Sequence, residues 1–118
     1  MELWNNITNI EKLQEAMYES DTSTVLLFKH STRCSISIMI KNRLESQWQK
    51  KCKIIPYCVD LLQYRDVSNA ITTIFEIEHQ SPQILIIDKQ KCIHYANHTD
   101  IKLKDIISKI AFNTPTIN

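Results

Sequence analysis

Residues 25–37 read VLLFKHSTRCSIS, an apolar run followed by a short polar segment and then by a cysteine. The apolar run is continuous rather than alternating, which predicts a strand covered on both faces. Apolar residues recur at every fourth position after Cys34, which predicts an amphipathic helix that begins there. Unpaired backbone N–H groups and the positive end of the helix dipole gather at such a helix start. They stabilise a thiolate, so Cys34 is the leading candidate for a reactive residue.

The same patterns predict the other elements of the chain. Helical spacing indicates a first helix that starts with a capping box from Thr8 to Glu11, and a last helix capped by Asp100. Pro56 lies inside the second strand, which indicates an edge or a bulge at that point because proline has no N–H to donate. The predicted helices span residues 8–20, 34–48, 65–77 and 101–110, and the predicted strands span residues 24–30, 54–59, 84–87 and 92–96.

This order of elements predicts an α/β thioredoxin fold. The first two strands need a helical crossover, so they should be parallel and right-handed. The last two are joined by the short polar segment 88–91 and should form an antiparallel hairpin. We therefore expect a four-stranded mixed sheet with helices on both faces and an extra N-terminal helix. Residues 1–113 are predicted to form a single domain, followed by a short flexible tail over 114–118.

Composition narrows the class of protein. The 118 residues are 43% hydrophobic and 23% charged, which is typical of a soluble globular domain. The net charge of +1 gives no overall positive electrostatic potential that would attract nucleic acid or an anionic membrane. Glycine is absent, which excludes the glycine-rich loops that bind phosphate. Turns and helix ends are therefore expected to use Asn, Asp, Ser or Pro. The N-terminus lacks the features of a secretory signal, so a cytoplasmic location is the default expectation. Structural disulfides are uncommon there, and the four cysteines are interpreted as thiols.

The surroundings of Cys34 suggest monothiol chemistry. Arg33 adds a neighbouring positive charge, and Ser37 stands one helical turn on, where a dithiol enzyme would carry its second cysteine. The Ser37 hydroxyl can hydrogen-bond a thiolate but cannot resolve a mixed disulfide. Cys34 would then attack a disulfide between a protein and a small thiol, take up the small thiol, and await a second thiol. The alternative from the residues alone is an inert cysteine at a helix start.

Ser81 and Pro82 form the second candidate element. A proline between a helix and a strand suits a cis peptide bond in a tight turn, although an ordinary trans loop proline fits the sequence equally. In the expected fold this turn faces the helix start, and the backbone of Ser81 could pair with an extended thiol substrate. His79 and His98 could flank the thiol, bind a carboxylate of the small thiol, or be ordinary exposed loop histidines.

The remaining candidate residues have weaker signals. Lys29 and His30 end the first predicted strand, and we expect at least one of them to point at solvent. Cys58 and Cys92 lie within strands and are predicted to be small core residues. Cys52 lies in a lysine-rich loop with nothing to place it near Cys34. The spacing of the cysteines contains no paired zinc knuckle, so no structural metal is expected.

Three segments carry a family resemblance. Residues 32–37 (TRCSIS), 79–83 (HQSPQ) and 96–98 (ANH) resemble the monothiol bacilliredoxins of the YtxJ type, which are thioredoxin-fold proteins of the bacillithiol system. The similarity runs from about residue 3 to 110. It implies that Cys34 is the reactive thiol and Pro82 the cis-proline. The family usually has proline directly after the cysteine, whereas this chain has Ser35, which leaves an extra N–H near the sulfur.

The resemblance implies a cytoplasmic thiol–disulfide oxidoreductase of the stress response that removes bacillithiol from modified proteins. Bacillithiol would be a co-substrate rather than a bound cofactor, and the partners would be thiol-modified proteins, with no nucleic acid and no membrane. The protein is expected to be a monomer. Two alternatives remain open at this point, both of them binding modules. One is a glutaredoxin-like carrier of an iron–sulfur cluster, which Ser35 and Ile36 do not match, and the other is a non-catalytic adaptor.

Overall fold

The computed structural model describes residues 3–49 and 52–113. The predicted tail over 114–118 lies outside the described residues. The strands are β1 (Asn5–Asn6), β2 (Thr24–His30), β3 (Ile54–Asp60), β4 (Gln83–Asp88) and β5 (Lys91–Asn97). The helices are α1 (Ile10–Glu19), α2 (Ser35–Gln47), α3 (Arg65–Phe75) and α4 (Leu103–Asn113), with a short 3-10 helix, η1 (His98–Asp100), before the last.

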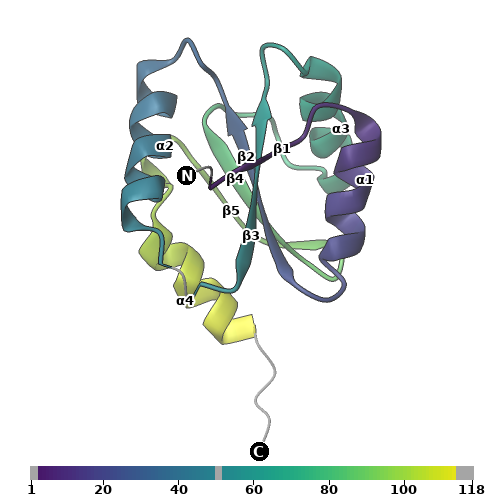
Figure 1. Ribbon diagram of the computed structural model, residues 1–118, viewed down its shortest axis with the longest axis vertical. Coiled ribbons are helices and arrows are strands. Elements are labelled where there is room, and N and C mark those ends of the chain that lie inside the picture. Colours follow the sequence, from purple (N-terminus) through teal and green to yellow (C-terminus); the bar gives the residue numbers. More distant parts are fainter. Residues whose placement is uncertain (1–2, 50–51, 114–118) are drawn as a thin grey trace, which may run out of the picture.

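The strands form one mixed sheet between two layers of helices (Figure 1). The strand order is β1-β3-β2-β4-β5, with β2 parallel to β3 and antiparallel to β4. Helices α2 and α4 cover one face, and α1 and α3 cover the other. This arrangement confirms the predicted α/β class, the parallel first pair and the antiparallel hairpin of the last two strands.

In the part of the chain that the structure describes, the sheet has five strands rather than the four predicted. The additional strand, β1, is only two residues long, and Asn5 and Asn6 pair in parallel with Tyr57 and Cys58 of β3. Two asparagines carry no β signal, which is why sequence patterns missed this strand. The pairing of β1 with β3 begins at Tyr57, directly after Pro56, so no residue of β1 is paired with Pro56 on the outer edge of β3. The missing N–H of proline predicted such an edge at this point.

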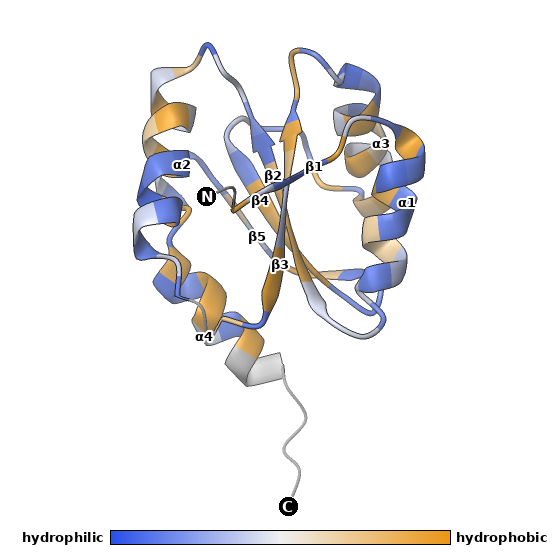
Figure 2. Ribbon diagram, viewed as in Figure 1, coloured by the Kyte–Doolittle hydropathy of each residue, from blue (hydrophilic) through white to orange (hydrophobic). Residues whose placement is uncertain are grey.

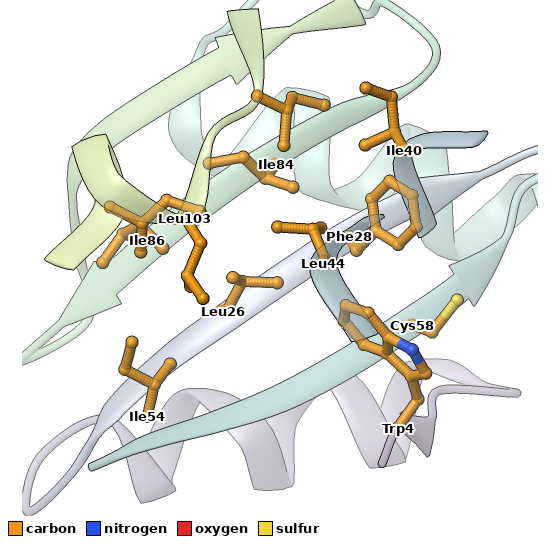
Figure 3. Packing of buried hydrophobic residues seen from close by; sticks show 12 residues of the cluster. Trp4, Leu26, Phe28, Ile40, Leu44, Ile54, Cys58, Ile84, Ile86 and Leu103 are labelled. Carbon is orange, nitrogen blue, oxygen red and sulfur yellow. The ribbon is translucent and has the colours of Figure 1, made fainter. Parts of the chain in front are cut away.

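The core consists of two apolar layers, one on each face of the central strands. Alternate side chains of β2 enter opposite layers: Leu26 and Phe28 face α2 and α4, whereas Val25 and Leu27 face α1 and α3. Figure 2 shows the central strands as largely hydrophobic between helices of mixed character. Figure 3 shows the first layer, where the side chains of β2 and β4 meet those of α2 and α4.

Helix α2 presents a different face to the core from the one the sequence predicted. Its buried residues are Ser37, Ile40 and Leu44, whereas Ile36 is 44% exposed. The expected ladder of every fourth residue therefore holds for Ile40 and Leu44 and is wrong for Ile36. A buried serine replaces the isoleucine at the start of the helix, next to Cys34.

The turns of this glycine-free chain also differ from expectation. Within the described ranges, four residues have positive φ, namely Glu76, Lys89, Gln90 and His98, and none of these four is Asn, Asp, Ser or Pro. At the hairpin, the backbone N–H of Lys89 donates to the carbonyl of Ser20 at 2.7 Å. The N–H of Gln90 donates to the Ser20 hydroxyl at 2.9 Å. These tertiary hydrogen bonds offset the local cost of the left-handed conformation.

Two predicted helix caps are displaced. The N-cap of α1 is Asn9 rather than Thr8, and its side chain accepts a hydrogen bond from the N–H of Lys12 at 2.8 Å. Asp100 lies in η1, three residues before α4 begins at Leu103, and the N–H groups of Asp105 and Ile106 in the first turn of α4 bond to the carbonyl of Lys102. Asparagine caps a helix at least as well as threonine, so the shift of one residue in α1 is consistent with cap preferences.

Candidate active site

Cys34 is the N-cap of α2, at the point where β2 has ended and the helix begins. Its backbone is extended, with φ −105° and ψ 118°, and its carbonyl accepts the N–H of Ile38 at 3.0 Å. The side chain is half-exposed. Within the described residues its sulfur makes no capping hydrogen bond. The helix start predicted from the sequence is therefore confirmed, and the thiol lies where unpaired N–H groups of the first turn are concentrated.

The Ser81–Pro82 segment lies at the same end of the sheet as Cys34. Gln83, the first residue of β4, pairs with Lys29 near the end of β2, so the residues just before Gln83 lie beside the loop just after Lys29. The peptide bond between Ser81 and Pro82 is cis. The sequence left cis and trans open, and the cis bond implied by the family resemblance is confirmed.

The cis-proline segment is held by hydrogen bonds from both sides. The backbone N–H of His98 donates to the carbonyl of Pro82 at 2.8 Å. The buried side chain of Gln83 donates from Nε2 to the carbonyl of Glu78 at 3.0 Å and to Oδ1 of Asn97 at 2.9 Å. The turn before β4 is therefore fixed to the end of β5.

Ser81 has a buried hydroxyl, and no partner for this Oγ is found among the described residues. The residue as a whole is half-buried, next to the buried Pro82. A buried hydroxyl without a partner is costly, so it favours a polar ligand or an ordered water at this position.

Ser37 is fully buried one helical turn after Cys34. Its Oγ accepts the backbone N–H of Ser31 at 3.0 Å and lies 2.6 Å from Nδ1 of His30. Ser31 follows directly on β2, so the hydroxyl ties the first turn of α2 to the loop that precedes Cys34.

Both residues at the end of β2 are buried, so the expectation that one of them points at solvent is wrong. Lys29 is 0% exposed and His30 is 6% exposed. They face opposite sides of the sheet because side chains alternate along a strand. His30 lies on the α2 side, with its ring centroid 5.4 Å from that of Phe28.

Lys29 enters the layer beneath α3 and has two neutral partners. Its Nζ donates to Oγ1 of Thr72 at 2.9 Å and lies 3.2 Å from Nδ1 of His79. Burial lowers the pKa of Lys29 to about 8. Burial also lowers the pKa of His79, and the positive charges of Lys29 and Arg65 lower it further.

The other candidates from the sequence lie around this arrangement at different depths. Arg33 and Ser35 flank Cys34 and are exposed. His79 and His98 are both exposed, but they contact different residues. His79 lies against Lys29, whereas the backbone N–H of His98 donates to the carbonyl of Pro82. The structure thus brings His98 to the cis-proline and His79 to the buried lysine.

The three other cysteines belong to the core or its margins. Cys58 is buried in the layer beneath α2 and α4, as predicted. Cys92 is half-buried against the opposite layer, and burial raises the pKa of its thiol. Cys52 packs against the same layer as Cys58.

No metal centre is found in residues 3–49 and 52–113, since no three His, Cys, Asp or Glu side chains gather there. An open groove of about 590 Å³ lies between the end of α3 and β5 and is lined by Ile74, Cys92 and Tyr95 among others. Cys34 does not line this groove. Among the described helices, none is long and apolar enough to cross a membrane.

Sequence reasoning missed Lys29 and His30 as parts of the site. Both are polar and end a strand, which made them look like surface residues. A signal was present nonetheless, because Lys29 continues the Val25 and Leu27 series and His30 continues the Leu26 and Phe28 series. In a strand that is covered on both faces, such positions are buried up to its end.

Solved structures share this fold. One described as a candidate oxidoreductase with a thioredoxin fold is 20% identical with a TM-score of 0.82, covering 92% of this chain and 94% of its own. The thioredoxin of Fasciola hepatica is 11% identical with a TM-score of 0.74, covering 93% and 99%. Mitochondrial thioredoxin 3 of Saccharomyces cerevisiae is 12% identical with a TM-score of 0.71, covering 92% and 94%. These similarities confirm the predicted thioredoxin fold.

A thioredoxin fold with a cysteine at the N-terminus of α2 and a cis-proline at the same end of the sheet defines the class of thiol–disulfide oxidoreductases. Within this class, a family model described as monothiol bacilliredoxin BrxC matches residues 5–106. The chain therefore belongs to the monothiol bacilliredoxin family.

Proposed function

We propose that this protein removes bacillithiol, a low-molecular-weight thiol, from mixed disulfides on cytoplasmic proteins through Cys34. The observation that carries the proposal is the position of Cys34, a half-exposed N-cap thiol at the same end of the sheet as the cis Ser81–Pro82 bond. Membership of the bacilliredoxin family supports bacillithiol as the small thiol. No resident cofactor is part of this proposal, since the small thiol acts as co-substrate.

The reaction needs only one cysteine of this protein. The Cys34 thiolate attacks the sulfur of the small thiol in the mixed disulfide, and the bond between the two substrate sulfurs breaks. The cysteine of the target leaves as a thiolate and takes a proton, while Cys34 retains the small thiol in a new disulfide. Ser37 occupies the position of a second cysteine, so a second thiol from solution must release the small thiol.

Several residues would support the thiolate and the substrate. The N–H groups of the first turn of α2, including that of Ser35, would face the thiolate, and Arg33 adds positive charge nearby. We propose that the backbone of Ser81 pairs with the substrate and that Pro82 shapes the groove. His79 and His98 would lie at the edges of the bound small thiol.

Exposed apolar side chains next to Cys34 support a protein as the other half of the substrate. Ile36 is 44% exposed and Met39 is 47% exposed, both on α2. Leu62 is 41% exposed and follows Leu61, whose N–H donates to the carbonyl of His30. Apolar groups placed around a reactive thiol favour contact with a protein surface.

The test is incubation of the reduced protein with a bacillithiolated target, followed by intact mass spectrometry of both. We expect the mass of one bacillithiol to move from the target to Cys34. The Cys34→Ser variant should leave the target modified, whereas Cys52→Ser, which replaces another half-buried cysteine, should behave as wild type. A target that stays modified while Cys34 remains free would contradict the proposal.

A further inference from the structure

His30 is a buried histidine at the end of the strand that leads to Cys34, and the function proposed above gives it no task. It faces α2, and only 6% of it is exposed. Its Nδ1 lies 2.6 Å from Oγ of Ser37, which is 0% exposed. A polar side chain buried in this way needs a specific partner, and the partner here is the hydroxyl one helical turn from the reactive cysteine.

The Ser37 hydroxyl can make one more hydrogen bond, which is available to Cys34. A serine hydroxyl has one hydrogen to donate and two lone pairs to accept with. The N–H of Ser31 donates to one lone pair at 3.0 Å, and His30 takes either the hydrogen or the second lone pair. Cys34 is the N-cap of α2 and Ser37 is the third residue of that helix, and an N-cap side chain reaches the second and third residues of its helix. The remaining lone pair or hydrogen is therefore within reach of the Cys34 side chain.

Cys34 can turn towards Ser37 without breaking a capping hydrogen bond. Among the described residues its sulfur makes no capping hydrogen bond. Rotation about χ1 moves the sulfur over the first turn of the helix, where Ser37 lies. Catalytic hydrogen bonds often shorten only when the substrate is bound, so the resting position of the sulfur is compatible with this movement.

His30 is a neutral imidazole near pH 7. Burial lowers its pKa, and the positive charge of Lys41 on α2 lowers it further. Asp60 on β3 and Glu45 on α2 act in the opposite direction. Glu45 is itself held by Lys41 at 2.8 Å and by the indole N–H of Trp4 at 2.6 Å. A neutral imidazole with a lone pair on Nδ1 can accept a proton from the Ser37 hydroxyl.

We propose that Ser37 and His30 form a proton relay for Cys34, an inference that rests on the proposed function of this site. When a disulfide binds, the proton of the Cys34 thiol moves to Oγ of Ser37 and the hydroxyl hydrogen of Ser37 moves to Nδ1 of His30, which leaves the thiolate that attacks. The bond between the substrate sulfurs breaks, and Cys34 forms a disulfide with the attacked sulfur. Ser37 contacts the reacting thiol, whereas His30 acts through Ser37 and is a positioning residue.

The proton then returns to the leaving group. The leaving sulfur takes the electron pair of the broken bond, and the imidazolium of His30 delivers the proton back through Ser37. One disulfide replaces another and one thiol replaces another, so the step needs no outside oxidant or reductant. Proton return matters most for alkyl thiolates, which are basic, and least for acidic aromatic thiolates.

This difference provides the test. The second-order rate constant of Cys34 is measured with 2-hydroxyethyl disulfide, whose leaving group is a basic alkyl thiolate, and with Ellman's reagent, whose leaving group is an acidic aromatic thiolate. The proteins are wild type, Ser37→Ala and His30→Asn, because asparagine places an amide near the position of Nδ1 but cannot titrate. His94→Asn is the control, since His94 is a half-buried histidine on β5 that takes no part in the proposed relay.

We expect Ser37→Ala and His30→Asn to lower the rate constant with 2-hydroxyethyl disulfide on the order of 100-fold. The rate constant with Ellman's reagent should fall by a factor that is at least about ten times smaller. His94→Asn should leave both rate constants within about twofold of wild type. If Ser37→Ala does not fold by circular dichroism, His30→Asn alone decides the test. Equal slowing of both disulfides, or none, would overturn the relay alone. A wild-type Cys34 that reacts with neither disulfide would overturn the proposed function and the relay with it.

Discussion

The hydroxyl of Ser37 lies 2.6 Å from Nδ1 of His30, and both side chains are buried. The same oxygen accepts the N–H of Ser31 at 3.0 Å, so one hydroxyl satisfies a buried imidazole and a buried backbone donor. This relationship ties the end of β2 to the first turn of α2. It therefore matters for the stability of the domain as well as for the chemistry of Cys34.

We expect Ser37→Ala to lower the free energy of unfolding by about 1–3 kcal/mol, because the substitution leaves Nδ1 of His30 and the N–H of Ser31 without their partner. The measurement is urea denaturation near pH 7.5. Ser46→Ala is the matched control on the same helix, where an exposed hydroxyl bonds to the carbonyl of Arg43. A loss no larger than that of Ser46→Ala would show that the Ser37 hydroxyl contributes little.

Ser35→Pro tests the residue that departs from the family pattern. Cys34 already has the extended backbone that favours a following proline, and Ser35 is the first residue of α2. We expect a gain in unfolding free energy of about 0.4–1 kcal/mol. Removal of the Ser35 N–H should slow alkylation of Cys34 by iodoacetamide at neutral pH about two- to fivefold. Faster alkylation would indicate that this N–H does not face the sulfur.

Lys29 is a buried cation whose partners among the described residues are the neutral side chains of Thr72 and His79. We expect Lys29→Met to raise the free energy of unfolding at pH 7 by about 1–3 kcal/mol, since a buried charge is replaced by an apolar side chain of similar length. Thr72 keeps its hydrogen bond to the carbonyl of Ser68. Lys91→Met, at an exposed position of β5, is the control and should change stability little.

The gain from Lys29→Met should depend on pH. The pKa of Lys29 is about 8 in the folded protein and 10.5 as a free side chain. Between these values the unfolded chain binds more protons, so the stability of wild type rises with pH and the difference between the two proteins shrinks. Urea denaturation at about pH 7 and about pH 9.5 measures this. A difference that stays constant would mean that Lys29 titrates normally.

The elements of the fold were predictable because their apolar residues repeat at helical or strand spacing. Strand β2 shows this most clearly, since its continuous apolar run correctly predicted a strand buried on both faces. The pattern could not reveal β1, because Asn5 and Asn6 are polar and exposed and so carry no apolar alternation. It also could not locate the left-handed residues Lys89 and Gln90, whose conformation depends on contacts with Ser20 some 70 positions earlier.

The candidate site was predictable where it follows from the order of elements. A strand followed by a cysteine and a helix predicted the place of Cys34, and the segment before β4 predicted that of Pro82. The surroundings of Ser37 were not predictable, because helical spacing placed Ile36 in the core instead. Burial of the serine depends on the tertiary contact with His30, which only the packing of α2 against β2 defines.

Acid should weaken the fold through its histidines. Burial lowers the pKa of His30, His79 and His94 below the ordinary value of about 6.5. As the pH falls below that value, the unfolded chain takes up protons before the folded one does, so stability decreases. We expect urea midpoints to fall between about pH 7 and about pH 5.5, and to fall less steeply in His30→Asn. Parallel pH profiles of the two proteins would contradict the assignment of His30.

Gln83 offers a way to test the cis-proline segment separately from Cys34. Its buried amide fixes the carbonyl of Glu78 and the side chain of Asn97, on either side of Ser81 and Pro82. Gln83→Ala should lower the rate of bacillithiol removal on the order of tenfold, because small displacements of substrate-binding backbone are costly in rate. Alkylation of Cys34 by iodoacetamide needs no groove and should stay within about twofold of wild type. Equal losses in both reactions would place the effect at the thiol itself, whereas an unchanged rate of removal would show that the substrate does not depend on this turn.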